Sequence, residues 1–227
     1  MEKKFEKATI GERVSSYLES RIAVLISVLV VAVVAIVAYC VSIAVISKNN
    51  EKGLADIDAI SYALTRDAAS LSDEELDARR TAAMDALEPL TVKNGVVGVR
   101  ANMLAAEIAY SQELYAEAAD FWMAAGNKGR KSYTNPIVFF NAGVCYEDIG
   151  DFDRAESCYA QAAGSADFLM ASHAEFNLGR VREANGNASG AVAAYQHLFD
   201  REPDSSWGKL AKTRLIALSS AASDDAE

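Results

Sequence analysis

The fold is decided by residues 139–162, FFNAGVCYEDIGDFDRAESCYAQA, because the same pattern returns at residues 175–198, EFNLGRVREANGNASGAVAAYQHL. A weaker copy precedes them at residues 102–125, NMLAAEIAYSQELYAEAADFWMAA. In every copy a small residue of the first half precedes an alanine of the second half by 12 positions, in the pairs Ala106 and Ala118, Gly143 and Ala155, and Gly179 and Ala191. A constant offset in three copies indicates an internal repeat.

Each copy has the pattern of two helices joined by a tight turn. Small residues at the shared positions allow two antiparallel helices to approach closely, and an aromatic residue one turn later, such as Tyr159 or Tyr195, fills the groove beside them. Gly150 and Gly186 lie midway in their copies, where a helix–helix turn needs a residue that tolerates a positive φ angle. We therefore predict an all-α fold built from stacked helical hairpins.

The repeat resembles the tetratricopeptide repeat (TPR), a 34-residue helix–turn–helix unit whose signature places W, L-G, Y, A, F and P along its two helices. The copies in this chain are 37 and 36 residues apart, which implies slightly longer connections between repeats. The alternative is a set of ordinary alanine-rich hairpins. The resemblance implies that the repeats pack through Ala106, Ala118, Trp122, Gly143, Tyr146, Ala155, Tyr159, Leu178, Gly179, Ala191, Tyr195 and Pro203.

The segments around the repeats complete a short α-solenoid behind an N-terminal anchor. Terminal repeats of such arrays need a cap with a polar outer face, and short acidic tails rarely fold. The predicted organisation is a short head at residues 1–21, a transmembrane helix at 22–47, a divergent helical pair at 48–94, three TPR-like repeats at 95–204, a capping helix at 205–218 and a disordered tail at 219–227.

The second helix of the divergent pair has a clear start signal. Ser72 and Glu75 are spaced as a capping box, in which each side chain binds the backbone N–H of the other residue. The helix is therefore predicted to begin at Asp73 and to end at Glu88, directly before Pro89.

An uncharged segment of 26 residues runs from Ile22 to Ser47. A helix of that length is roughly 39 Å long, against a hydrocarbon core of about 30 Å, so it can span a bilayer. A cleaved signal peptide has an apolar core of only about 7–15 residues. A lipoprotein signal would put a small residue before the modified cysteine, whereas Tyr39 precedes Cys40. We interpret the segment as an uncleaved anchor in contact with the lipid bilayer.

Charge sets the expected orientation. The head carries five Lys or Arg residues, and the 20 residues after the span carry three, namely Lys48, Lys52 and Arg66. This bias predicts a single-pass protein with a cytoplasmic N-terminus and an extracytoplasmic C-terminal domain, periplasmic in a bacterium. The reversed topology is the alternative, and it would make the domain a cytoplasm-facing docking receptor.

Composition argues against several classes of function. The chain has 22 Lys and Arg against 32 Asp and Glu, a net charge of −10, so its surface repels nucleic-acid phosphates. His173 and His197 are 24 residues apart and match no metal-binding spacing. We therefore expect no nucleic-acid partner, no metal, no cofactor and no catalytic residues. Cys145 and Cys158 fall in the two helices of one hairpin, where they form either a disulfide or two buried thiols.

In TPR proteins the first helix of each repeat lines a concave groove that binds other proteins. Carried onto this chain, the resemblance implies an apolar stripe of Met103, Phe140 and Phe176 along that groove; the alternative is that some of these residues pack against residues 60–64 or the capping helix. The implied groove residues are Arg100, Met103, Glu107, Tyr110, Ile137, Phe140, Val144, Glu147, His173, Phe176, Arg180 and Glu183.

A membrane anchor followed by TPR-like repeats is similar to bacterial inner-membrane proteins of the ancillary translocon-subunit kind, which hold secreted chains or scaffold envelope machinery. The resemblance implies a membrane-anchored scaffold, adaptor or chaperone-like holder without catalysis. The alternative is a structural subunit of an oligomeric envelope complex. The oligomeric state stays open.

Overall fold

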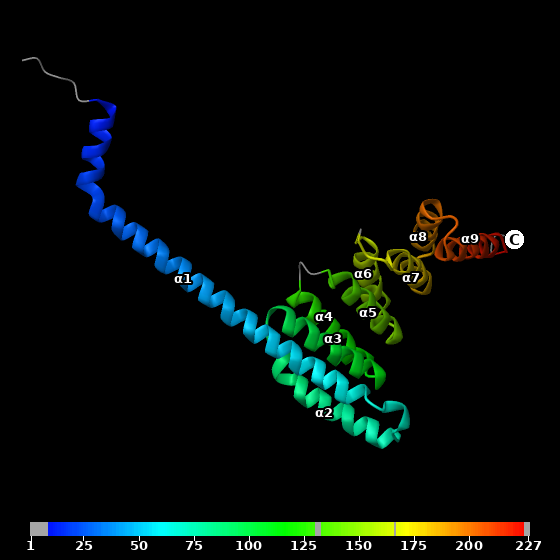
Figure 1. Cartoon of the computed structure of the whole chain (residues 1–227). Coiled ribbons are helices and arrows are strands. Elements are labelled where there is room, and N and C mark those ends of the chain that lie inside the picture. The colour runs from blue at the N-terminus through cyan, green and yellow to red at the C-terminus, as the bar shows by residue number, and fades with distance from the viewer. Residues whose placement is uncertain (1–8, 130–132, 166, 225–227) are drawn as a thin grey trace, which may run out of the picture. The chain divides into compact units, whose positions relative to one another are not determined.

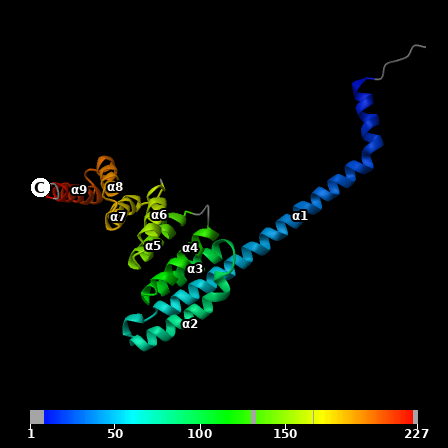
Figure 2. The same ribbon diagram turned by 180° about the vertical axis from the view of Figure 1, so that it is seen from behind.

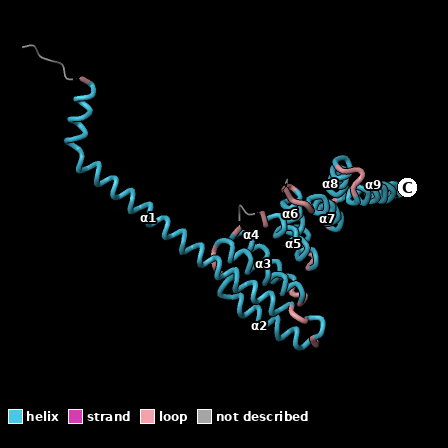
Figure 3. The backbone as a smooth tube through the Cα atoms, viewed as in Figure 1, coloured by secondary structure: helices cyan, strands magenta, loops and turns pink. Residues whose placement is uncertain are grey.

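The computed structural model describes residues 9–129, 133–165 and 167–224, and all regular structure in these ranges is helical (Figure 3). Figure 1 gives the helix labels, and the helices are α1 Ile10–Thr65, the short 3₁₀ helix η1 Ala68–Ser70, α2 Asp73–Thr91, α3 Gly95–Ser111, α4 Tyr115–Lys128, α5 Asn135–Asp148, α6 Phe152–Ala163, α7 Ala171–Ala184, α8 Ala188–Arg201 and α9 Ser206–Asp224.

The chain divides into two compact units, residues 1–52 and residues 53–227. The described part of the first unit is the N-terminal portion of α1, in which every residue from 21 to 49 is exposed. Within the described ranges, one helix is long and apolar enough to cross a membrane, and it is this one. The expected boundary between the transmembrane helix and the divergent helical pair, after residue 47, is not a break in secondary structure, because α1 continues to Thr65.

The second unit is a linear array of helices. From α2 to α9 each helix contacts the next one along the chain, and α7 also contacts α9. The three copies of the repeat form the hairpins α3/α4, α5/α6 and α7/α8, and Figure 2 shows the same succession from behind. Consecutive contacts of this kind are the hallmark of a solenoid, in which each hairpin is stabilised by its neighbours.

The two glycine turns form as expected. Gly150 has φ 75° and Gly186 has φ 76°, both in the left-handed region. The next residues, Asp151 and Asn187, cap the following helices by accepting hydrogen bonds from the backbone N–H three positions on, at 3.1 and 2.9 Å. The first hairpin has no glycine here, and Glu113 adopts φ 61° instead. The weaker first copy therefore has the more strained turn.

The aromatic residues of the second helices are the centres of the repeat cores. Tyr159 and Tyr195 have no exposed surface, and Trp122 is nearly as deeply buried. Their rings press against the small residues of the preceding helices, among them Gly143 and Gly179. The other implied packing residues that are buried are Ala106, Ala118, Tyr146, Ala155, Leu178 and Ala191, whereas Pro203 is exposed.

The N-terminal helical pair supplies a separate core. Ile57 of α1 is buried with Ala83 and Leu87 of α2 and with Val97 of α3. The predicted capping box is present, since the Ser72 and Glu75 side chains each accept the other's backbone N–H.

Two predicted helix ends are wrong. The second helix of the pair does not stop at Glu88 but includes Pro89 and ends at Thr91. Pro89 lacks a backbone N–H, so the last turn of α2 loses one hydrogen-bond donor but stays helical. The C-terminal helix does not stop at residue 218 either, since α9 continues to Asp224. Residues 219–224 are thus helical rather than disordered, because alanine and serine extend a helix already fixed by packing. The rest of the expected tail lies outside the described residues.

The C-terminal helix covers the last repeat. Ala211 of α9 is fully buried with Tyr195 and Leu198 of α8, and Trp207 packs against the same cluster. This contact closes the apolar surface that an uncapped last hairpin would expose.

Candidate functional site

Two adjoining hollows lie along the first repeat, and they share Glu107. The first, which we call the first-junction pocket, has a volume of about 300 Å³ and is lined by Glu107, Tyr110, Trp122, Asn141 and Val144. The second, which we call the N-terminal pocket, has a volume of about 290 Å³ and is lined by Ile57, Ser61, Arg100, Met103, Leu104, Glu107, Tyr133 and Thr134. Together they form a surface on which α3 contributes to both pockets.

The first-junction pocket combines an aromatic wall with carboxylates. The hydroxyl of Tyr110 donates a hydrogen bond to Oδ2 of Asp148 at 2.9 Å. Burial, helped by this carboxylate, raises the pKa of Tyr110 to about 12. Burial also raises the pKa of Glu107, and the positive charge of Arg100 partly offsets this effect. A partly desolvated carboxylate of this kind favours a donor or a cation from a ligand.

The N-terminal pocket has a cationic side. The guanidinium of Arg100 lies 3.4 Å from a carboxylate oxygen of Asp58, an exposed pair between α3 and α1. Met103 is half-buried and gives the pocket its apolar floor together with Leu104 and Ile57. The two hollows therefore present charged and apolar side chains of α3 beside one another.

The next junction along the array is closed by an ion pair. Arg180 of α7 binds both carboxylate oxygens of Glu147 of α5, with Nη2 2.7 Å from Oε2. The hydroxyl of Tyr159 donates to the same Oε2 at 3.0 Å. Burial and this carboxylate both raise the pKa of Tyr159, so the phenol stays protonated and remains a donor.

The last junction repeats this arrangement with α9. The guanidinium of Arg214 binds Glu183, with Nε 3.2 Å from Oε2, and the hydroxyl of Tyr195 donates to the same oxygen at 3.3 Å. Burial raises the pKa of Tyr195 to about 12. Each later junction thus contains a tyrosine, a glutamate and an arginine in one hydrogen-bonded set, which we call a rung.

The expected apolar stripe of three residues is wrong at Phe140. This ring is only 7% exposed and packs edge-on against Tyr159, Phe168 and His173, with ring centroids 5.8, 6.2 and 4.9 Å apart. It belongs to the core between α5 and α7, because the connection that contains Phe168 folds over it. Phe140 is therefore not available to a partner.

The expected groove residues of the third copy are covered in part by the capping helix. His173 stacks on Trp207 of α9, with ring centroids 3.9 Å apart and planes 12° apart. Phe176 lies 5.5 Å from the same indole. Burial lowers the pKa of His173, which favours the neutral imidazole. The alternative of packing against the capping helix is what the structure has here.

The remaining expected groove residues separate into two groups. Ile137 is exposed but lines neither hollow, and Glu147, Arg180 and Glu183 are engaged in the rungs. The expected residues that line the two hollows are Arg100, Met103, Glu107, Tyr110 and Val144.

Sequence reasoning missed several groove residues. The repeat pattern gives Trp122 only a packing role and gives Ser61, Tyr133 and Thr134 none, although each of the four lines one of the hollows. Tyr133 and Thr134 lie in the connection between the first two hairpins, where the repeat pattern has no register. The signal that could have found Trp122 is its place across the same hairpin from Tyr110, at the same offset of 12 as Tyr159 from Glu147.

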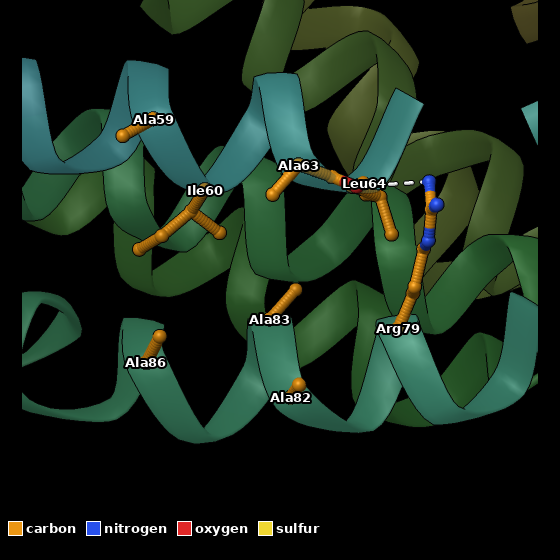
Figure 4. Close-up of a pocket in the computed structure, with 8 residues that line it drawn as sticks. All are labelled: Ala59, Ile60, Ala63, Leu64, Arg79, Ala82, Ala83 and Ala86. Atoms are coloured by element: carbon orange, nitrogen blue, oxygen red, sulfur yellow. Dashed lines mark hydrogen bonds between the residues drawn. The ribbon is translucent and has the colours of Figure 1, made fainter. Parts of the chain in front are cut away.

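A third hollow, of about 310 Å³, lies between the C-terminal part of α1 and α2. Figure 4 shows its walls, which are mainly the small side chains of Ala59, Ala63, Ala82 and Ala86. Arg79 borders it and donates to the backbone oxygen of Ala63 at 3.2 Å. This surface lies on the helical pair that precedes the repeats.

The described residues contain no group of three His, Cys, Asp or Glu side chains placed to hold a metal ion. Cys145 and Cys158 are buried free thiols and not a disulfide. Burial raises the pKa of Cys145 to about 12 and that of Cys158 to about 11, so neither thiol is an activated nucleophile.

Comparison with known proteins identifies one of the repeats by its sequence. Residues 173–205 match the family model of the tetratricopeptide repeat. Over 127 residues the chain is 34% identical to a TPR repeat-containing protein of Treponema pallidum (strain Nichols), an alignment that covers 56% of this chain and 53% of the relative. The chain thus spans about half the length of this curated relative.

Solved structures agree on the fold. The crystal structure of the kinesin light chain TPR-like repeats of Podosopora anserina superposes with a TM-score of 0.53 at 12% identity, covering 65% of this chain and 81% of that one. A single-residue variant of the same repeats gives the same values. The chain therefore carries a tetratricopeptide repeat at residues 173–205, within a helical array that has the fold of TPR-like repeats.

Proposed function

We propose that this chain is a membrane-anchored module for protein–protein interaction, without catalysis, which binds partner segments in the groove of its first repeat. TPR repeats point to a protein–protein interaction scaffold. The single observation that carries the assignment of the site is the pair of adjoining hollows around Glu107, in a part of the array where the described residues form no rung.

The anchor is the segment 22–47. Its support is that the apolar side chains of this stretch are uniformly exposed, which in water would leave a surface far larger than a monomer tolerates. The charge bias supports an orientation with the head in the cytoplasm and the C-terminal domain outside it, which in a bacterium is the periplasm. A holder or scaffold for secreted or envelope proteins fits this location.

Site-specific photo-crosslinking tests the groove. A benzophenone amino acid replaces Met103 in the N-terminal pocket, and the matched control carries it at Gln161, an exposed position on α6. We expect protein adducts in intact cells from position 103 and none from position 161. Equal labelling from both positions, or adducts with the chain itself only, would favour the structural subunit of an oligomeric complex.

Protease protection of a C-terminal tag in sealed membranes of known sidedness tests the anchor. We expect the chain to resist alkaline extraction, and the tag to lie on the extracytoplasmic side. A tag on the cytoplasmic side contradicts the proposed orientation and leaves a cytoplasm-facing docking receptor. Complete extraction contradicts the anchor itself. A span carrying Val33→Lys and Val34→Lys is the control, since each central lysine costs about 3 kcal/mol of insertion free energy.

A further inference from the structure

The first-junction pocket has a counterpart at each later junction of the array, because the repeat brings five equivalent positions together each time. At the first junction these positions hold Glu107, Tyr110, Trp122, Asn141 and Val144. At the second junction they hold Val144, Glu147, Tyr159, Asn177 and Arg180, and at the third Arg180, Glu183, Tyr195, Ala211 and Arg214.

At both later junctions an arginine of the array itself fills this place. Arg180 reaches back from α7 to the carboxylate of Glu147, and it also lies 3.5 Å from the side-chain oxygen of Asn177. Arg214 reaches back from α9 to Glu183 in the same way. The aromatic residue of the second helix supports the carboxylate in each case, through the tyrosine hydroxyl.

At the first junction none of the described residues places an arginine in this pocket, and Arg100 acts on Glu107 from the adjoining N-terminal pocket. Val144 stands at the position of Arg180 and is too short to cross the space, while Tyr110 stands at the position of the glutamate. The space therefore remains open, with a volume of about 300 Å³. Its carboxylate comes from Glu107, one turn earlier on α3, which makes no hydrogen bond or ion pair within the described ranges.

We propose that this pocket receives an arginine side chain from the partner protein. The methylene groups of the arginine would pack on Trp122 and Val144, and the guanidinium would face Glu107 and the ring of Tyr110. Guanidinium groups bind carboxylates through two parallel hydrogen bonds and also stack on aromatic faces, so both walls of the pocket are used. A partner carboxylate is disfavoured, because Glu107 and Asp148 repel it.

The inference rests on the proposed interaction function and adds the side chain that the groove selects. The array itself favours arginine over other cations. At the two later junctions the equivalent place is filled by Arg180 and by Arg214, and each binds a glutamate carboxylate through two nitrogens. A lysine has a single nitrogen and cannot reproduce this fork.

Binding of four blocked pentapeptides to the whole chain in detergent micelles tests the proposal. The probes are acetyl-Ser-Ala-Xaa-Ala-Ser-amide with arginine, lysine, citrulline or glutamate at the central position, and calorimetry measures their affinities. Citrulline keeps the shape of arginine without its charge. We expect the arginine peptide to bind at least tenfold more tightly than the citrulline peptide, the lysine peptide to lie between them, and the glutamate peptide not to bind.

A variant that supplies the missing arginine gives the second arm. Val144→Arg places the array's own guanidinium in the pocket, so we expect it to abolish binding of the arginine peptide while the melting temperature holds or rises. Val192→Arg, at an exposed position on α8, is the matched control and should bind as the unmodified chain does.

A Trp207→Phe background isolates the fluorescence of Trp122, which should respond to the arginine peptide.

Three results overturn the proposal: no binding of the arginine peptide, equal binding of the arginine and citrulline peptides, or undiminished binding by Val144→Arg. These outcomes are separable from a failure of the proposed function. If position 103 crosslinks a partner while arginine and citrulline peptides bind alike, the proposed interaction function is supported and the proposed selectivity for arginine is wrong. If the arginine peptide binds selectively but no partner crosslinks, the selectivity of the pocket is supported and the proposed interaction function is wrong.

Discussion

The ring of Tyr159 lies directly on Gly143, so that a Cβ atom added to this glycine would stand 2.9 Å from Cε1 of the tyrosine. The same pair recurs one repeat later, where a Cβ on Gly179 would stand 2.5 Å from Cε1 of Tyr195. Both rings are fully buried and cannot swing away. The closeness of the two helices in each hairpin therefore depends on the absence of a side chain at one position.

Alanine substitutions at the glycines should destabilise the array in a graded way. Alanine has a higher helix propensity than glycine by about 1 kcal/mol, which opposes the effect, whereas overpacking a core costs about 1–3 kcal/mol. We expect Gly179→Ala to lower the unfolding free energy most and Gly143→Ala less, as measured by denaturant melts of the whole chain in detergent.

Gly126→Ala is the comparison for this series. A Cβ there would lie 3.2 Å from a methyl group of Val138, which can shift slightly. This variant should be close to neutral. If all three variants have the same unfolding free energy, the close approach of ring and glycine does not limit the packing.

The stacked pair of His173 and Trp207 should make the third repeat sensitive to acid. Burial lowers the pKa of His173, so between its folded pKa and its unfolded value of about 6.5 the unfolded chain binds a proton that the folded chain does not. The contribution of the neutral His173 side chain to the free energy of unfolding is therefore present above about pH 6.5 and is lost as the pH falls towards the folded pKa. We expect the melting temperature to drop from pH 7.5 to pH 5.5, with a change in Trp207 fluorescence.

His173→Phe tests this assignment, because phenylalanine keeps a ring against Trp207 but does not titrate. Its melting temperature should fall less than that of the unmodified chain over the same pH interval. An identical fall in both proteins would assign the pH dependence to the carboxylates of the surface instead.

The buried thiols should be unreactive in the folded chain. With pKa values of about 12 and about 11, Cys145 and Cys158 are ionised at pH 8 only to roughly one part in ten thousand and one part in a thousand. In a Cys40→Ser background we expect a maleimide reagent at pH 8 to modify neither thiol within minutes, and to modify both once denaturant unfolds the repeats. Rapid modification of the folded chain would show that the α5/α6 hairpin opens frequently.

The parts of the structure that sequence predicts well are those fixed within one hairpin. The offset of 12 between Gly143 and Ala155 and the turn at Gly150 depend on neighbouring residues alone, and both are found where the pattern puts them. The ion pairs of the rungs join residues 33 and 31 positions apart, the first between two hairpins and the second between the last hairpin and the capping helix, so they depend on how these elements stack. No local pattern contains that information.

Phe140 is a residue whose environment the repeat register predicts wrongly. Its position in the repeat is that of a groove residue, as for Met103, but the connection between α6 and α7 brings Phe168 onto its ring. Connections vary between repeats and follow no period, so the residues that they cover cannot be read from the register. At the first junction the described residues leave a pocket, where Val144 stands at the position that Arg180 takes at the next junction.

The rung at the second junction should stabilise the array more than an ordinary surface ion pair. The side chain of Glu147 is only 18% exposed, so Arg180→Ala leaves a poorly hydrated carboxylate with Tyr159 as its remaining donor. Because the arginine itself is 46% exposed, we expect a loss of about 1 kcal/mol rather than the several kcal/mol of a fully buried pair.

The comparison is Arg66→Ala, which removes a pair whose side chains are 63% and 70% exposed and should change stability by less than about 0.5 kcal/mol. Melts at low and high salt separate the two, since screening weakens the exposed pair first. Equal losses in the two variants would mean that the rung closes the junction by filling space and adds no electrostatic stability.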